Sequence, residues 1–231
     1  MSEQYIWFVW SSAFLVPWGL LFALAPDHRR IILQASLATM PFGLTEPLFV
    51  PEYWSPPSLF DLALRTGFDI ESLIFCFAIG GIGVVLYNAV TGAESRPVSN
   101  AYRRAPLHRH HKLAIATPFL VFPVLYFLPW NPIYPSIVAM TAGSIATLLC
   151  RPDLWSKTWV GGMFFTGFYW LYLAGLTLLS PGYVERVWNL AVLSGIMILG
   201  SPLEELLFAF TFGMYWAGVY EHLTWQTPAP A

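Results

Sequence analysis

The sequence has few charged residues. Only 10% of its 231 residues are Asp, Glu, Lys or Arg, whereas a soluble domain carries roughly 25%. This scarcity excludes an ordinary water-soluble globule and a disordered chain. Eleven Lys and Arg against thirteen Asp and Glu give a net charge of −2, which excludes a nucleic-acid binder. Because 57% of the residues are hydrophobic and the mean hydropathy is +0.59, the composition predicts a protein that crosses a membrane several times.

Chemically reactive residue types are scarce too. The two cysteines, Cys76 and Cys150, are too few for a disulfide framework or a cysteine-based zinc cluster. The only lysines, Lys112 and Lys157, lie at the edges of apolar runs, which excludes an opsin with a Schiff-base lysine deep in its last span. The aspartates form no closely spaced pair that could hold magnesium for prenyl-diphosphate chemistry. We therefore expect no cofactor and no metal.

Glycines and histidines form two short clusters. Gly80-Gly81-Ile82-Gly83 follows no predicted strand, so it is not a dinucleotide fingerprint and instead favours close helix packing. His108, His110 and His111 are a possible metal motif. Because Arg and Lys surround them, we interpret this segment as a solvated stretch that faces lipid headgroups.

Continuous apolar runs predict an all-α membrane protein with seven spans. A helix needs about 20 apolar residues to cross the hydrocarbon core. The start lacks the basic region of a cleaved signal peptide, so we expect the first run to be retained as a span. Gly200-Ser201-Pro202 interrupts the last run, which leaves 187–199 as an interfacial or re-entrant segment and an eighth short span as an alternative. The expected spans are 5–25, 30–50, 70–91, 112–129, 133–150, 158–180 and 200–222.

The distribution of Lys and Arg predicts the orientation. Nine of the eleven lie in the odd-numbered connections and two in the others, which predicts an outside N-terminus and a cytoplasmic C-terminus in the cell (inner) membrane. The nine are Arg29, Arg30, Arg96, Arg103, Arg104, Arg109, Lys112, Arg151 and Lys157; the two are Arg65 and Arg186.

An internal repeat relates the two halves of the chain. At an offset of 133, residues 69–88 and 202–221 share six identities, among them Glu71 with Glu204. Two parallel three-helix modules joined by one additional helix account for this repeat and for the charge distribution. The predicted organisation is a first module over 1–91, a basic loop and linking helix over 92–132, a second module over 133–222 and a tail over 223–231.

Several acids lie inside or at the ends of the predicted spans. A carboxyl within a membrane costs about 2.5–3.5 kcal/mol on insertion scales, so each is a candidate for function. Glu71, Glu204 and Glu205 are the catalytic candidates. A purely structural alternative exists for Glu204, because Ser201-x-x-Glu204 also reads as a helix capping box. Glu221 is expected near water, and Glu46 lies either in a pocket or in the interface.

The strongest motif is Gly200-Ser-Pro-Leu-Glu-Glu-Leu-Leu-Phe208 followed by Tyr220-Glu221. It resembles the PxEExxF…YE signature of the lycopene cyclase domain family, the small, flavin-independent membrane cyclases. The resemblance implies two fused three-helix modules and conversion of the ψ-ends of lycopene into β-ionone rings. It also implies that Glu204 and Glu205 are the acid/base pair, with Glu71 as their counterpart in the first module. The first module departs from the signature, since Asp69-Ile-Glu71-Ser72 lacks the proline and the second glutamate.

The expected reaction is an isomerisation. A protonated glutamic acid donates to a terminal double bond, the cation closes a six-membered ring, and a carboxylate removes a proton. The expected partners are a carotenoid and membrane lipid, with no nucleic acid. Alternatives are a cyclase for another polyene or terpene end, and a non-catalytic polyene-binding or proton-translocating membrane protein. Candidate substrate-binding residues, which line the path or stabilise the cation, are Phe75, Phe77, Phe208, Phe210, Tyr215 and Glu46.

Overall fold

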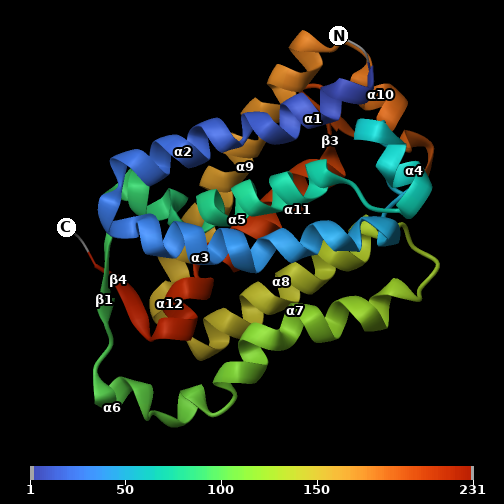
Figure 1. Cartoon of the computed structure of the whole chain (residues 1–231). Helices are drawn as coiled ribbons and strands as arrows, with labels where there is room; N and C mark the ends of the chain where they lie inside the picture. The colour runs from blue at the N-terminus through green and yellow to red at the C-terminus, as the bar shows by residue number, and fades with distance from the viewer. Residues whose placement is uncertain (1–2, 230–231) are drawn as a thin grey trace. The chain divides into compact units, whose positions relative to one another are not determined.

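The computed structural model of the chain describes residues 3–229 and is 76% helical (Figure 1). Four helical stretches are long and apolar enough to cross a membrane. Two of them, α5 (Ile70–Thr91) and α8 (Ile133–Cys150), coincide with the predicted spans 70–91 and 133–150. The apolar helices confirm the membrane protein predicted from composition.

The other two long stretches are composite. The first consists of α1 (Glu3–Ala13) and α2 (Leu15–Leu24). The second is a 3-10 turn, η5 (Pro152–Leu154), that continues into α9 (Trp155–Leu179). They cover the predicted spans 5–25 and 158–180.

The remaining three expected spans form shorter or irregular helices. The span predicted at 30–50 consists of α3 (Arg29–Thr39) and the 3-10 helix η2 (Met40–Leu48), which contains Pro47. The linking helix α7 (His111–Tyr126) is 16 residues long and contains two prolines. The last span divides at Gly218 into α11 (Leu203–Ala217) and α12 (Val219–Thr224). Proline removes a helix hydrogen bond, which explains part of the irregularity. Seven crossings therefore stay a prediction.

Short strands order the segments near the helix ends. β1 (Glu94–Pro97) pairs antiparallel with β4 (Gln226–Ala229), so the part of the predicted 223–231 tail that the structure describes joins the basic loop; residues 230–231 lie outside the described range. β2 (Met197–Ile198) pairs with β3 (Ser201–Pro202) just before α11. The remaining short elements are η1 (Pro26–His28), η3 (Leu59–Asp61), α4 (Leu62–Thr66), α6 (Asn100–Arg103), η4 (Pro106–His108), α10 (Tyr183–Val187) and η6 (Leu190–Val192).

The chain forms two compact units. Unit 1 comprises 3–82 and 170–205, and unit 2 comprises 83–169 and 206–229. Each unit combines segments from both halves of the sequence.

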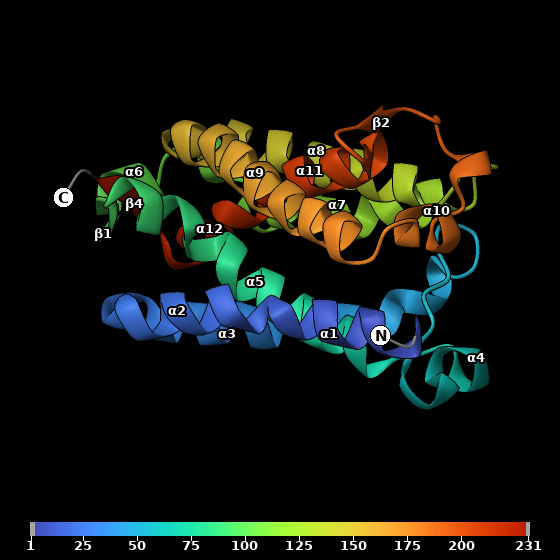
Figure 2. The ribbon, with the colours of Figure 1, turned by 90° about the horizontal axis from the view of Figure 1, so that it is seen from above.

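Close helix packing in unit 1 confirms the prediction for the glycine cluster. A Cβ atom on Gly80 would lie 1.7 Å from Thr39 Oγ1, and one on Gly81 would lie 2.3 Å from Ser36 Oγ. The indole of Trp18 also donates a hydrogen bond to Ser36. In Figure 2 α2 and α3 overlap, and the bond from Trp18 to Ser36 links the two helices. Only glycine at these positions lets α5 approach both helices.

Unit 2 is built around two packed helices, α7 and α8, which lie side by side in Figures 1 and 2. A Cβ atom on Gly143 would lie 2.3 Å from the ring of Pro118, so α8 approaches α7 closely at that point. The turn at 127–132 joins the two helices at one end.

Candidate active site

The acid pair of the signature lies in the first turn of α11. Glu204 is 1% exposed and Glu205 is 4% exposed. Pro202 in β3 precedes the helix, so the β2–β3 hairpin sets where α11 begins. Successive residues of a helix are rotated by about 100°, and the two carboxyl groups accordingly find different partners.

Glu205 accepts two hydrogen bonds at the same oxygen. The Tyr53 hydroxyl and the Trp188 indole, whose Nε1 lies 2.7 Å away, both donate to Glu205 Oε1. The two donors come from segments that pair with each other: the Asn189 amide donates to the Tyr53 carbonyl at 2.9 Å, and Trp54 bridges to Trp188. The Glu205 side chain is therefore oriented by two connecting segments, one with Tyr53 and one with Trp188, which are distant in sequence but pair with each other.

Glu71 and Glu204 are each tethered by a backbone amide. The Leu59 amide donates to Glu71 Oε1 at 2.7 Å, and the Ser194 amide donates to Glu204 Oε1 at 2.8 Å. In both cases the donor lies in the connection that precedes the helix, 12 residues before Glu71 and 10 residues before Glu204. The two glutamates that the sequence repeat aligns thus have the same kind of partner.

The capping-box alternative for Glu204 is wrong. The Ser201 hydroxyl is buried and has no hydrogen-bond partner within residues 3–229, so it does not cap α11. The Glu204 carboxyl accepts from Ser194 instead. A β-hairpin before α11 replaces the open helix start that a capping box needs.

Two further acids are buried in unit 1. Asp69 Oδ1 accepts the Ser72 amide at 2.5 Å and so caps α5. Burial raises the pKa of the Asp69 carboxyl and the Glu71 charge adds to the rise, although the bond from Ser72 opposes it. Glu46 is 7% exposed and its carboxyl lies beside Ser72 and Trp54, which places it inside the unit rather than at the water interface.

The predicted aromatic residues of α5 also lie in unit 1. Phe75 is four residues beyond Glu71 and contacts the rings of Trp7 and Phe14, with centroids 5.6 and 5.3 Å apart. Phe77 contacts Trp18 at 5.2 Å. The acids of this unit are therefore accompanied by an aromatic cluster contributed by α1, α2 and α5.

Phe208, Phe210 and Tyr215 belong to unit 2. Phe208 contacts Tyr169 at 6.4 Å, and Phe210 contacts Trp159 at 6.1 Å. The Tyr215 hydroxyl donates to the Ile115 carbonyl. These contacts are packing contacts of α11 against α9 and α7, and a role in substrate binding stays a prediction.

Glu221 does not lie near water, contrary to the prediction. It is 1% exposed, and its Oε1 lies 2.5 Å from Nζ of Lys157, which is itself fully buried. Asn88 accepts a second hydrogen bond from Lys157, and Ser95 donates to Glu221. The attraction between Lys157 and Glu221 offsets the cost of removing both side chains from water.

Tyr53 and Trp188 were not identified from the sequence. Both lie in connecting segments, outside every predicted span. One signal was available: Trp54 and Trp188 are 134 residues apart, close to the repeat offset of 133.

The arrangement in unit 1 suits proton transfer away from water. Carboxyl groups can donate or accept protons without a metal or an electron acceptor. Buried in apolar, aromatic surroundings and held by neutral hydrogen-bond donors, they are kept from bulk solvent. Glu71, Glu204, Glu205 and Glu46 all lie in this unit.

Comparison with known proteins agrees with the motif. Residues 130–223, 94 of the 231 residues, match the family model described as Lycopene cyclase. No curated protein and no solved structure matches the chain. The match includes Glu204, Glu205 and Glu221, so the resemblance predicted from Pro202 to Glu221 is confirmed: residues 130–223 are similar to the lycopene cyclase family.

Proposed function

We propose that the chain is a carotenoid end-group cyclase that converts the linear ψ-ends of lycopene into β-ionone rings without net redox change. The observation that carries the proposal is the burial of Glu204 and Glu205 inside a segment that matches the lycopene cyclase family. The family match supports cyclase activity, and the buried carboxyls supply the acid and base that such a cyclisation needs.

Proton donation is assigned to Glu204, with Glu71 as its counterpart in the first module. A neutral carboxylic acid accepts a hydrogen bond at its carbonyl oxygen and donates from its hydroxyl. The backbone amide of Ser194 donates to Glu204 Oε1, and that of Leu59 donates to Glu71 Oε1. Each Oε1 thus accepts a hydrogen bond, as the carbonyl oxygen of a neutral carboxylic acid does. The acid proton passes to the terminal C=C of the polyene and leaves a tertiary carbocation.

Ring closure and proton removal complete the reaction. A neighbouring double bond of the substrate attacks the cation and forms the six-membered ring, which moves the positive charge into the ring. Glu205, whose Oε1 already accepts from Tyr53 and Trp188, is assigned as the base that removes a ring proton. One proton is added and one is removed, so the product is an isomer. Aromatic faces such as that of Phe75 stabilise a passing cation by about 2 kcal/mol when desolvated.

The proposal includes the finer membrane arrangement. Seven spans would form two parallel three-helix modules, 1–91 and 133–222, with the N-terminus outside and the C-terminus cytoplasmic. The matched tethers of Glu71 and Glu204 support the repeat. An apolar carotenoid would then enter from the lipid of the cell membrane.

Expression in a lycopene-accumulating host with pigment analysis tests the function. The wild type should convert lycopene to products with cyclic ends. Glu204→Gln and Glu205→Gln should each lower the yield by about 10²-fold or more, because proton transfer by a positioned side chain contributes 10²–10⁴-fold. Glu185→Gln is the matched control, since Glu185 is an exposed glutamate of the same unit.

Two outcomes would contradict the proposal. Unchanged lycopene in cells with well-expressed wild type would favour another polyene substrate or a non-catalytic membrane protein. Cyclic products that persist in both Gln variants would remove the two glutamates from the mechanism. Protein level and detergent-extracted monodispersity, measured for every variant, separate loss of chemistry from loss of folding.

A further inference from the structure

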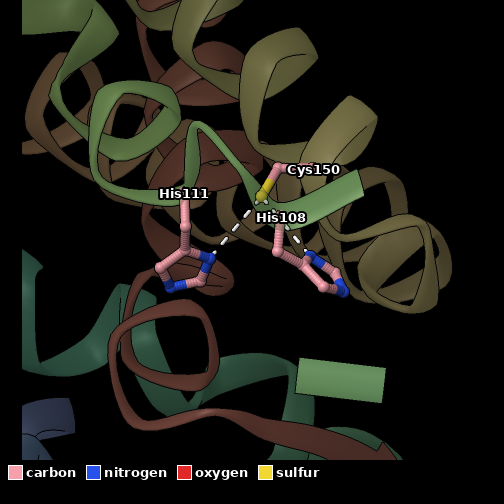
Figure 3. Close-up of side chains that lie close together, drawn as sticks. All are labelled: His108, His111 and Cys150. Atoms are coloured by element: carbon pink, nitrogen blue, oxygen red, sulfur yellow. Dashed lines mark hydrogen bonds between the residues drawn. The ribbon is translucent and has the colours of Figure 1, made fainter. Parts of the chain in front are cut away.

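Three potential metal ligands meet in unit 2. Figure 3 shows the rings of His108 and His111 with the thiol of Cys150 between them. Cys150 Sγ lies 3.6 Å from His108 Nδ1 and 3.5 Å from His111 Nδ1, and all three atoms lie within 4.8 Å of one another. Contrary to the expectation of a solvated segment, His108 is only 7% exposed, whereas the neighbouring His110 is exposed.

The spacing is that of ligands around a tetrahedral ion. With Zn–S of about 2.3 Å and Zn–N of about 2.1 Å, a tetrahedral angle places sulfur and nitrogen about 3.6 Å apart. The two observed sulfur-to-nitrogen distances agree with this value. Two of the three spacings between the ligand atoms therefore already suit a tetrahedral ion.

The orientation of His111 is fixed by its second nitrogen. His111 Nε2 lies 2.9 Å from the backbone carbonyl of His222, and a carbonyl can only accept, so Nε2 carries the hydrogen. The lone pair is then on Nδ1, the atom that faces Cys150. The rings of His222 and Trp225 stack on His111, each with centroids 3.9 Å apart. This support of a histidine through its other nitrogen is typical of metal ligands.

Hydrogen bonding alone satisfies the cluster poorly. A thiol has one proton and can donate to one of the two Nδ1 atoms that face it. His108 Nε2 is also buried and has no hydrogen-bond partner within residues 3–229. A cation would use the lone pairs of all three facing atoms at once.

We propose that His108, His111 and Cys150 bind a divalent, borderline-soft transition-metal ion of the zinc type. One sulfur and two imidazole nitrogens are the donor set that such ions prefer. Three protein ligands leave a fourth position, which a water or a small anion fills. His111 also lines a cavity of about 660 Å³ through which an ion could enter. Arg103, Arg109 and Lys112 line the same cavity, so an anionic fourth ligand is favoured.

The ion would have a structural role, because it would link the start of α7 to the end of α8. His108 ends η4, His111 is the first residue of α7, and Cys150 is the last residue of α8. The 127–132 turn already joins one end of the α7–α8 pair, and the metal would join the other. The site involves none of the acids assigned to cyclisation, so it can be tested without an activity measurement.

Cobalt and zinc binding to the purified full chain in detergent test the site. The metal-free wild type should bind about one Co²⁺ per chain, with the intense visible bands of tetrahedral cobalt and a thiolate-to-cobalt charge-transfer band. Zn²⁺ should displace the Co²⁺. Cys150→Ser and His108→Gln should each weaken binding by at least about 10-fold. Cys76→Ser and His110→Gln are the matched controls and should bind like the wild type.

A second measurement uses the unaltered protein. Zn²⁺ should slow maleimide labelling of Cys150 by at least about 10-fold and raise the apparent melting temperature, and EDTA should reverse both effects. Absence of the charge-transfer band, equal binding by Cys150→Ser, or labelling that is insensitive to Zn²⁺ would overturn the proposal. The three residues would then form only a thiol–imidazole hydrogen-bonding cluster.

Discussion

The two units bury ionisable groups in different ways. In unit 1, neutral groups donate hydrogen bonds to the buried carboxyls: backbone amides to Glu71 and Glu204, a phenol and an indole to Glu205. In unit 2, a cation does so, since Lys157 lies 2.5 Å from Glu221. Both arrangements satisfy buried acids, but only the second pairs an acid with a base.

The difference indicates which acids can do chemistry. A carboxyl that faces a buried ammonium is held by its partner, because moving a proton to a third group would leave one of the two without its partner in a low-dielectric interior. A carboxyl that accepts hydrogen bonds from neutral donors can exchange a proton at a lower free-energy cost than one that faces a buried ammonium. The contrast therefore separates a structural acid, Glu221, from the catalytic candidates Glu204 and Glu205, although all three belong to the matched family segment.

Removing one partner of the buried pair should have the largest effect on stability. Lys157→Met leaves the Glu221 carboxylate without its cation, and breaking a buried pair costs about 3–5 kcal/mol. Lys157→Met combined with Glu221→Gln should recover most of this loss, because no charge is left and Gln can still bond to Ser95. The apparent melting temperature in detergent, followed by tryptophan fluorescence, measures both variants.

The exposed pair between Arg96 and Glu94 is the control. Its nitrogen and oxygen are 3.1 Å apart and both side chains are more than half exposed, so Arg96→Met should cost less than about 1 kcal/mol. If Lys157→Met is as mild as Arg96→Met, or if the double variant is no better than the single one, charge pairing does not distinguish unit 2.

Removing a neutral donor in unit 1 should reduce cyclisation more than stability. Tyr53→Phe deletes one of the hydrogen bonds to Glu205 Oε1, and a hydrogen bond to a charged group contributes about 1.5–3 kcal/mol. Turnover of lycopene in membranes should fall by about 10-fold or more. Tyr183→Phe is a close control, since the Tyr183 hydroxyl is buried but has no hydrogen-bond partner within residues 3–229. Equal turnover of the two variants would argue against a positioning role for Tyr53.

Much of the fold was predictable where one apolar run forms one helix. The runs at 70–91 and 133–150 coincide with α5 and α8 because nothing interrupts their hydrogen bonding beyond the first turn. The prediction is less accurate at 112–129, where Pro118 and Pro123 lie inside α7, and near Gly218, where the helix divides. Hydropathy averages over such residues, whereas the backbone responds to each one.

The site was predictable only in part, for a related reason. Glu204 and Glu205 are adjacent and form a motif, so the sequence identifies them. Tyr53 lies 152 residues from Glu205, and its contact depends on how two connecting segments pair, which no local pattern contains. Lys157 and Glu221 were assigned to the water interface because a hydropathy scale assigns a cost to each charge alone. Neutralisation by a distant partner is a property of the fold.

The smallest expected effect concerns Asp69, which differs from Glu221 because none of the groups that shift its pKa is a cation. Burial raises the pKa of Asp69, the hydrogen bonds from Ser72 oppose the rise, and Glu71 adds to it. Its pKa in the folded protein is raised above 3.8, so the folded state binds the proton more tightly than the unfolded chain. The ionised carboxylate therefore lowers stability as the pH rises above about 4.

Asp69→Asn keeps a capping side chain for α5 and removes the charge, so it should match the wild type at about pH 4 and become the more stable protein towards about pH 8. Asp69→Ala removes the cap as well and should cost about 1 kcal/mol relative to Asp69→Asn at every pH. Melting temperatures of the three proteins across this range separate the two contributions. An advantage of Asp69→Asn that shrinks as the pH rises would mean that the Asp69 charge is compensated after all, and unit 1 would then resemble unit 2.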